Sequence, residues 1–248
     1  MSDTSTSEHF PPAQPRTALV AGGTGALGGA VTARLLDSGW QVAVPYRREG
    51  RALEALRRSH PAAVADGRLR LSQADAADPD QVAALLDVLC ADWGPLWLAC
   101  STIGGWTGGT DVVDTDDVAL VDRMVLINLR TAFVVAREGL RHMGAEGGRV
   151  IVVGSGTVRR PARGQAAYSA AKAGLHSLVE TLAEELRGSR RTANAVVPGV
   201  IDTEDNRRAM PDADRSRWVP PEAIAEVVAF LASAGAWPVS GALIPVRG

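Results

Sequence analysis

The sequence predicts an α/β fold in which one doubly wound sheet of about seven parallel strands carries helices on both faces. Short apolar runs, mostly without polar alternation, recur along the chain and are separated by longer segments with helical periodicity. A glycine cluster at 22–28 directly follows the first of these runs. The 248 residues contain no internal repeat, and 46% of them are hydrophobic, which is enough for one large core. These observations together predict a single α/β domain.

From Arg16 the strands and helices alternate to the end of the chain. The first helix has apolar residues at Leu27 and Val31, a spacing that places one helix face on the sheet. Pro220 and Pro221 mark the start of the last helix, where a missing N–H costs little. The predicted strands are 17–21, 41–44, 69–73, 96–100, 150–153, 193–197 and 242–246. The predicted helices are about 26–38, 50–59, 80–90, 115–143, 167–187 and 220–232, and a polar loop at about 200–219 precedes the last of them.

The first 15 residues are polar and proline-rich, and we expect a disordered lead-in there, followed by a single domain at 16–248. They show no signal-peptide pattern, and no apolar run in the chain reaches the roughly 18–20 residues of a membrane-spanning helix. The spacing of Cys90 and Cys100 fits no metal site and gives no reason to expect a disulfide. The formal net charge of −2 carries no electrostatic signature for nucleic acid or an anionic membrane. The sequence therefore predicts a cytoplasmic protein without metal, nucleic-acid or membrane partners.

One pair of residues indicates chemistry. The chain has two tyrosines and a single lysine, and Lys172 follows Tyr168 by four positions on a predicted helix. Residues i and i+4 share a helix face, so the ammonium would stabilise the tyrosinate and lower the phenol pKa from about 10. A phenol tuned in this way can exchange a proton with a substrate oxygen. The alternative is a chance pair on a surface helix.

Two further residues favour the chemical interpretation. Ser155 lies thirteen residues before Tyr168, just after an apolar strand, where a side chain can face a cleft. Asn128 lies in an apolar predicted helix, where a buried amide needs hydrogen-bond partners. Asn128, Ser155, Tyr168 and Lys172 resemble the catalytic tetrad of the short-chain dehydrogenase/reductase family. The resemblance spans about 16–248 and implies a single Rossmann-type domain.

This resemblance implies an oxidoreductase that transfers a hydride between a nicotinamide and a carbonyl or secondary alcohol. In reduction, Tyr168 would donate the proton to the substrate oxygen. Lys172 would hold the ribose hydroxyls of the cofactor and lower the tyrosine pKa. Ser155 would orient the carbonyl, and Asn128 would hold a water that links Lys172 to solvent.

The glycine cluster matches a cofactor loop. Gly22, Gly25 and Gly28 form a G-x-x-G-x-x-G pattern between a strand and a helix, where backbone N–H groups can approach a pyrophosphate. The short branch of the family usually has T-G-x-x-x-G-x-G, and here Ala26 takes the place of the middle glycine. Asp75 ends the third strand at the family's adenine-contacting position, with an ordinary loop carboxylate as the alternative. The resemblance places further cofactor contacts at Thr24, Leu27, Tyr168, Lys172, Pro198, Gly199, Ile201 and Thr203.

The end of the second strand distinguishes NAD from NADP. An acidic side chain there binds the ribose 2′-OH and repels a 2′-phosphate. This chain has Tyr46 at that position, followed by Arg47 and Arg48, and guanidinium groups bind phosphate well. NADP(H) is therefore favoured. NAD(H) is the alternative, because the arginines could be a solvated helix start and the glycine loop carries no basic residue.

The segment after the fourth strand departs from the family. The usual Asn-Asn-Ala-Gly is STIG at 101–104, so the asparagine side-chain contacts are lost. Residues 104–109 read GGWTGG and resemble a loop of dihydropteridine reductases, which makes Trp106 a candidate stacking surface for a flat substrate. The alternative is a tryptophan that packs the loop or a subunit contact. That branch typically uses NADH and lacks the serine, so Ser155 and Arg47 argue against its substrate.

Three other functions are compatible with parts of the sequence. A serine hydrolase built on Ser155 lacks the G-x-S-x-G elbow and a late histidine. A nucleotide-binding sensor without catalysis is disfavoured by the intact tetrad, and dehydration or epimerisation could use the same residues. By resemblance we expect a small carbonyl or alcohol substrate, of polar character judging from the loop at 200–219. The resemblance also implies a homodimer or homotetramer that uses the helices at 115–143 and 167–187.

Overall fold

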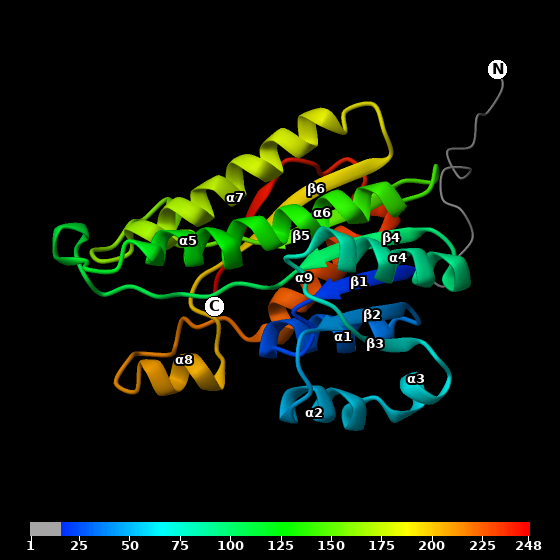
Figure 1. Ribbon diagram of the computed structural model, residues 1–248, viewed down its shortest axis with the longest axis horizontal. Helices are drawn as coiled ribbons and strands as arrows, with labels where there is room; N and C mark the ends of the chain where they lie inside the picture. The colour runs from blue at the N-terminus through cyan, green and yellow to red at the C-terminus, as the bar shows by residue number, and fades with distance from the viewer. Residues whose placement is uncertain (1–15) are drawn as a thin grey trace, which may run out of the picture.

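The computed structural model describes residues 16–248, so the predicted lead-in at 1–15 lies outside the described residues. Its centre is one seven-stranded sheet with the strand order β3-β2-β1-β4-β5-β6-β7 (Figure 1). All neighbouring strands run parallel, which confirms the predicted fold class. The strands are β1 (Thr17–Ala21), β2 (Gln41–Tyr46), β3 (Leu69–Gln73), β4 (Leu96–Ser101), β5 (Gly148–Val153), β6 (Arg191–Pro198) and β7 (Leu243–Val246).

Helices cover both faces of the sheet (Figure 1). One core, which includes Leu86, Val135 and Val179, lies between the sheet and helices α4, α6 and α7. A second core, which includes Val31 and Val228, lies under α1 and α9, and these two helices contact each other. The helices are α1 (Ala26–Asp37), α2 (Arg51–Ser59), α3 (Pro61–Ala65), α4 (Pro79–Trp93), α5 (Ala119–Val125), α6 (Thr131–His142), α7 (Ala166–Glu185), α8 (Glu204–Ala209) and α9 (Pro221–Ala232).

The longest predicted helix differs most from its prediction. It begins at Ala119 instead of about 115, and a π-helical turn, η3 (Leu126–Arg130), divides it into α5 and α6. Asn128 lies in this turn. The extra residue of a π turn shifts the side-chain register, a feature that is frequent at functional sites.

Smaller differences concern loops and ends. The predicted loop at 200–219 contains α8, which begins where the Thr203 hydroxyl accepts a hydrogen bond from the Asn206 N–H, 3.2 Å away. The short helix α3 was not predicted, because five residues give too little periodicity to detect. The second strand extends to Tyr46, two residues beyond its predicted end.

Features that would indicate other classes of protein are not found in 16–248. No helix in this range is long and apolar enough to cross a membrane, and no group of three or more His, Cys, Asp or Glu could hold a metal ion. Cys90 and Cys100 are free thiols. Burial raises the pKa of Cys100 to about 12, so this thiol is not a nucleophile at neutral pH.

Candidate active site

The predicted site residues follow the carboxyl ends of the strands. Because the sheet is parallel, these ends lie at one edge, and the strand order changes direction between β1 and β4. A crevice at such a switch point is where α/β sheets bind ligands. In Figure 1 the arrowhead of β1 points toward the side of the view on which α5 and α8 lie.

Lys172 is fixed in the interior beside this edge. Only 3% of the residue is exposed, and its Nζ donates a hydrogen bond to the Val153 carbonyl, 2.7 Å away, at the end of β5. Nζ lies 6.0 Å from the centroid of the Tyr168 ring, one turn back on α7. Burial lowers the pKa of the ammonium to about 8. The helix therefore brings the two residues together, as their spacing predicts.

The electrostatic prediction for Tyr168 is wrong in direction. Burial raises the pKa of the phenol, and the nearby Ser155 hydroxyl acts weakly in the opposite sense. We expected Lys172 to lower this pKa, but the ammonium is bonded to the Val153 carbonyl and removal of the phenol from water dominates. Tyr168 is therefore a neutral phenol at pH 7, the form that can donate a proton.

Ser155 directly follows the turn after β5 and is almost fully buried. Its Oγ lies 2.9 Å from the Thr157 Oγ1 and also accepts a hydrogen bond from the Thr157 N–H at 3.3 Å. Its own N–H donates to the His176 Nε2, 3.3 Å away. These contacts fix both the backbone and the hydroxyl of the serine.

Asn128 is fully buried, and its side chain holds the loop after β4. The amide Nδ2 donates to the carbonyls of Gly105 (2.9 Å) and Met124 (3.1 Å), and Oδ1 accepts from the Gly105 N–H at 3.2 Å. Gly104 lies between the amide and the ammonium. A Cβ added to Gly104 would stand 3.1 Å from the Asn128 Oδ1 and 3.3 Å from the Lys172 Nζ. The structure thus places Asn128 beside Lys172, with its side chain occupied by the loop.

The glycine loop makes a close turn between β1 and α1. Gly22 has φ +89°, a left-handed conformation that favours glycine, and its carbonyl accepts from the Gly25 N–H at 2.9 Å. A Cβ on Gly28 would lie 2.1 Å from the Gly22 carbonyl oxygen, so no larger residue fits there. Leu27 is buried in the core, whereas Thr24 is half-buried and Gly25 is exposed at the helix start. The free N–H groups of α1 therefore open to the carboxyl edge.

Thr102 provides a contact that the sequence analysis did not foresee. We expected the loss of both asparagines from the segment at 101–104 to remove side-chain contacts there. The Thr102 hydroxyl instead donates to the Ala21 carbonyl at 3.0 Å, parallel to the bond from its own N–H at 2.9 Å. The Thr102 Oγ1 would lie 2.6 Å from a Cβ on Gly22 and 2.6 Å from a Cβ on Gly28. This threonine ties the loop after β4 to the glycine loop.

The end of β2 carries two unpaired cations. Arg47 and Arg48 are exposed and make no ion pair within 16–248. The first acidic residue, Glu49, accepts a hydrogen bond from the Tyr46 hydroxyl (2.8 Å) and one from Arg57 (3.4 Å). The bond to Glu49 raises the pKa of the Tyr46 phenol. Glu49 is thus engaged by its neighbours and leaves both arginines available.

The other predicted cofactor residues lie on neighbouring loops. Asp75 lies two residues after the end of β3, and its Oδ1 caps the next turn by accepting from the Ala77 N–H at 2.9 Å. Pro198 ends β6, and Gly199 follows it, exposed. Ile201 pairs with Val219, and Thr203 begins α8. These residues gather along the same edge of the sheet as the glycine loop.

Trp106 lies on a loop that is tied to the loop after β5. The Gly109 N–H donates to the Gly164 carbonyl at 2.8 Å, and Arg163 forms an ion pair with Asp111. The tryptophan itself is 55% exposed. A hollow farther along this loop is lined by Gly109, Thr110, Asp111, Asp114 and Arg163.

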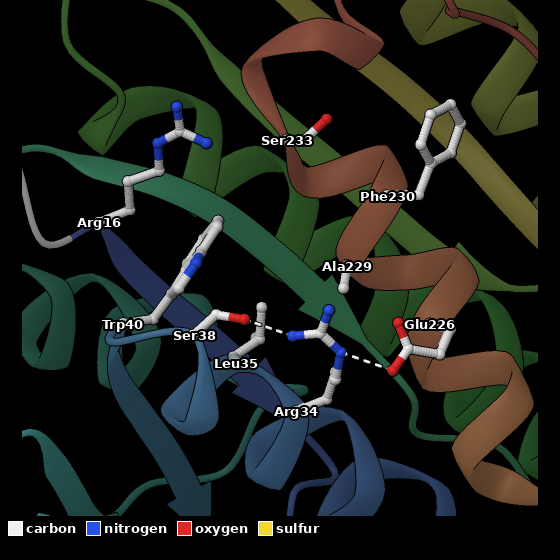
Figure 2. A pocket seen from close by; sticks show the side chains of 9 residues that line it. All are labelled: Arg16, Arg34, Leu35, Ser38, Trp40, Glu226, Ala229, Phe230 and Ser233. Atoms are coloured by element: carbon white, nitrogen blue, oxygen red, sulfur yellow. Dashed lines mark hydrogen bonds and ion pairs between the residues drawn. The ribbon is translucent and has the colours of Figure 1, made fainter. Parts of the chain in front are cut away.

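A hollow at the opposite edge of the sheet does not belong to this site. It lies between α1 and α9, beside Arg16 at the amino end of β1 (Figure 2). Figure 2 shows Arg34 bonded to both Ser38 and Glu226 across it, with 2.6 Å between the Arg34 Nε and the Glu226 Oε1. The bond from Arg34 to Glu226 joins α1 to α9, whereas the bond to Ser38 lies within the end of α1, so the hollow is a gap between two helices that are bonded to each other.

Two residues that contact the tetrad were not predicted from the sequence. Thr157 bonds the Ser155 hydroxyl, and His176 bonds the Ser155 backbone. His176 could have been found, because it follows Lys172 by the same four-residue step that joins Lys172 to Tyr168. Thr157 offers no such signal, because its role depends on the turn after β5.

Comparisons with known proteins agree with this arrangement. The family model described as short chain dehydrogenase matches residues 16–214. The 3-oxoacyl-acyl-carrier-protein reductase MabA of Mycobacterium tuberculosis is 32% identical, over 100% of this chain and 98% of its own. A short-chain dehydrogenase/reductase structure from Serratia marcescens is 31% identical with a TM-score of 0.82, over 95% of this chain and 98% of its own. A blue fluorescent protein from a metagenomic library, solved in complex with NADPH, is 30% identical with a TM-score of 0.80, over 93% and 96%.

The family match covers most of the described residues, and the relatives align over nearly their whole length. Parallel sheet, glycine loop and the tyrosine–lysine helix are all present in this chain. The protein belongs to the short-chain dehydrogenase/reductase family, and it is an oxidoreductase that binds NAD(P)(H) and acts on CH–OH or C=O groups.

Proposed function

We propose that the protein reduces a small carbonyl compound with NADPH. The observation that carries the choice of cofactor is the pair Arg47 and Arg48, which directly follows β2 and is exposed. Glu49 is held by Tyr46 and Arg57, so no free carboxylate of this segment faces a 2′-phosphate. A guanidinium pair favours a 2′-phosphate by charge-assisted hydrogen bonds. The relative solved with NADPH supports the same choice.

The loop after β1 fits a dinucleotide. Its backbone can approach a pyrophosphate closely, because Gly22, Gly25 and Gly28 bear no side chains and a Cβ on Gly28 would strike the Gly22 carbonyl. The first N–H groups of α1 have no intrahelical acceptors and attract an anion. In our proposal Thr24 and the backbone of Leu27 flank the phosphates, Asp75 contacts the adenine, and Pro198, Gly199, Ile201 and Thr203 border the nicotinamide.

The proposed chemistry uses the tetrad for proton transfer and orientation. Tyr168 gives its proton to the substrate oxygen. The phenol still carries this proton at neutral pH because its pKa is raised. Ser155 donates a hydrogen bond to the same oxygen, and the Thr157 Oγ1, 2.9 Å from the Ser155 Oγ, can donate to Ser155 in turn. Lys172 stabilises the phenolate by its charge once the proton has left. A bound nicotinamide supplies the hydride to the carbonyl carbon.

Asn128 has a different proposed task from the one that the resemblance implies. Its side chain is used by Gly105 and Met124, so we propose that it holds the loop after β4 against Lys172. The water that the family resemblance places between Lys172 and solvent would then be bound by backbone groups near Asn128. This proposal is compatible with its place in a π-helical turn, where backbone carbonyls are displaced from the helical ladder.

The test is NADPH consumption at 340 nm with a panel of aldehydes and ketones. Tyr168→Phe should lower kcat by about 10²- to 10⁴-fold, the usual contribution of a positioned acid, and should keep the cofactor-induced thermal shift. A Tyr168→Phe variant with wild-type turnover would overturn the proposed chemistry. Cofactor binding without turnover of any carbonyl would favour the sensor alternative.

The choice of cofactor has its own matched variants. Arg47→Ala and Arg48→Ala should weaken NADPH binding by about tenfold each and leave NADH binding nearly unchanged, because only NADPH carries the 2′-phosphate. Arg58→Ala removes an exposed arginine from the last turn of α2 and is the control. If the Arg47 and Arg48 variants lost affinity for NADPH and NADH equally, the proposal that these arginines bind the 2′-phosphate would be contradicted.

A second candidate substrate is a flat heterocycle of the pterin type. Trp106 supports it, because the ring is half-exposed on a loop whose Gly104 lies against Lys172. Stacking on this ring would orient a planar substrate. Trp106→Ala should then raise KM for a dihydropteridine more than for an aliphatic ketone, and equal KM changes would dismiss this candidate.

We also propose a homodimer or homotetramer. Apolar side chains remain exposed along α5, the π turn and the start of α6, and such a face is usually covered by another subunit. They are Val118, Val121, Val125, Leu126 and Phe133. Sedimentation at micromolar concentration should give two or four chains per particle, and a monomer would contradict the proposal.

A further inference from the structure

A third polar residue continues the helix face that carries Tyr168 and Lys172. His176 follows Lys172 by four residues on α7, so the three side chains lie along one face. The residue is only 5% exposed. A buried imidazole needs a hydrogen-bond partner, and the identity of that partner indicates what the ring does.

The partner is the backbone of the tetrad serine. The Ser155 N–H donates to the His176 Nε2 at 3.3 Å, so this nitrogen bears no proton and the neutral ring carries its proton on Nδ1. The ring also packs on the residue before the serine. A Cβ on Gly154 would lie 2.4 Å from Nε2, which leaves room only for glycine. The imidazole therefore fills the space behind the 154–155 turn and bonds its backbone.

The surroundings keep the ring neutral, as the bond requires. Burial lowers the pKa of His176, the positive charges of Lys172 and Arg159 lower it further, and Glu180 acts in the opposite sense. An imidazolium has no acceptor atom and could not accept the Ser155 N–H. The hydrogen bond from the Ser155 N–H to His176 is therefore retained at neutral pH beside the charged Lys172.

We propose that His176 is a positioning residue that holds the Ser155 backbone, so that the serine hydroxyl stays directed at the substrate oxygen. The His176 ring fixes the amide of the serine from one side, and the Thr157 hydroxyl fixes its Oγ from the other. Since Tyr168 and His176 belong to the same rigid helix, α7 sets the position of the proton donor and of the serine together. This inference rests on the proposed function, in which Ser155 orients the carbonyl.

The kinetic test compares His176→Leu with His176→Gln. The leucine leaves the Ser155 N–H buried without an acceptor, and kcat should fall about tenfold while the Kd for NADPH changes less than about twofold. The glutamine amide oxygen can accept the same N–H, and this variant should recover most of the lost kcat. His142→Leu is the control, because it removes a helical histidine that bonds Asp87 on the far helix α4.

A double-mutant cycle separates positioning from general stability. If His176 acts through the serine, His176→Leu should not slow a Ser155→Ala enzyme any further. An equal fold-loss in the wild-type and Ser155→Ala backgrounds would overturn the proposal, and so would unchanged kcat in His176→Leu.

A spectroscopic readout is independent of activity. With ¹⁵N-labelled histidine, the Nε2 of His176 should show the shift of an unprotonated nitrogen at pH 7, and Ser155 amide exchange should accelerate in His176→Leu. A protonated Nε2 would overturn the positioning role whatever the enzyme reduces. Absence of carbonyl reduction with an unprotonated, bonded Nε2 would instead count against the proposed function and leave the bond established.

Discussion

Lys172→Met tests how strongly folding shifts the pKa of Lys172, the only lysine in the sequence. Burial lowers the pKa of Lys172 from the ordinary 10.5 to about 8. At about 1.4 kcal/mol per pKa unit, this difference means that burial of the charged lysine lowers the free energy of unfolding by about 3 kcal/mol. Methionine keeps most of the side-chain length and has no charge to bury.

The pH dependence follows from proton linkage. Below about pH 8 the lysine is charged in both the folded and the unfolded chain, and the folded state bears the whole penalty. Between about pH 8 and 10.5 the unfolded chain binds more protons than the folded protein, so the free energy of unfolding of the wild type rises with pH. Lys172→Met lacks this titration. The wild type should therefore gain about 3 kcal/mol relative to the variant between pH 7 and 10.5.

Two measurements check this result. Urea unfolding of both proteins across this pH range gives the difference in free energy of unfolding, and groups that titrate equally in both proteins cancel. Because Lys172 is the only lysine, ¹³C-lysine labelling gives a single Cε signal whose titration reports the pKa directly. A pKa near 10.5, or a stability difference that stays constant with pH, would refute the burial argument.

Two further predictions concern the loops around the tetrad. Gly28→Ala should abolish the thermal shift produced by NADPH, because its Cβ would lie 2.1 Å from the Gly22 carbonyl oxygen. Gly29→Ala is the control and should keep the shift, because its Cβ would meet nothing closer than 3.6 Å. A full thermal shift in Gly28→Ala would contradict the loop geometry. Asn128→Ala should lower the free energy of unfolding in urea by roughly 1–3 kcal/mol and speed amide exchange at Gly105, since it removes both bonds to that residue; unchanged Gly105 exchange would show that the loop is held by other contacts.

Sequence patterns were sufficient for the fold because the central strands are buried on both faces. A run such as 150–153 is apolar throughout and reads as a parallel strand, and the glycines after β1 mark the turn into α1. The π-helical turn at Asn128 could not be predicted, because periodicity across 115–143 does not resolve one extra residue. Helix α8 was missed for a similar reason, because five of its six residues are polar and all six are exposed or half-buried.

The spacing of residues in the sequence predicted part of the geometry of the candidate site, but not the directions of its pKa shifts. The i, i+4 spacing put Tyr168 and Lys172 on one face, and this is found. The direction of the Tyr168 pKa depends on burial and on the bond that holds Lys172 to β5, neither of which a spacing contains. The role of His176 likewise depends on a contact between α7 and the turn after β5. Long-range contacts of this kind appear only when the chain is folded.

Whether the protein prefers NADPH can be measured directly by thermal unfolding with saturating NADPH and NADH, each at the same concentration. A ligand at a hundred times its dissociation constant stabilises the folded state by about 2.7 kcal/mol, which gives a measurable shift in Tm. We expect a clearly larger Tm shift with NADPH than with NADH, and loss of that difference when Arg47 and Arg48 are both replaced by alanine. An equal or larger shift with NADH would contradict NADPH-dependent reduction.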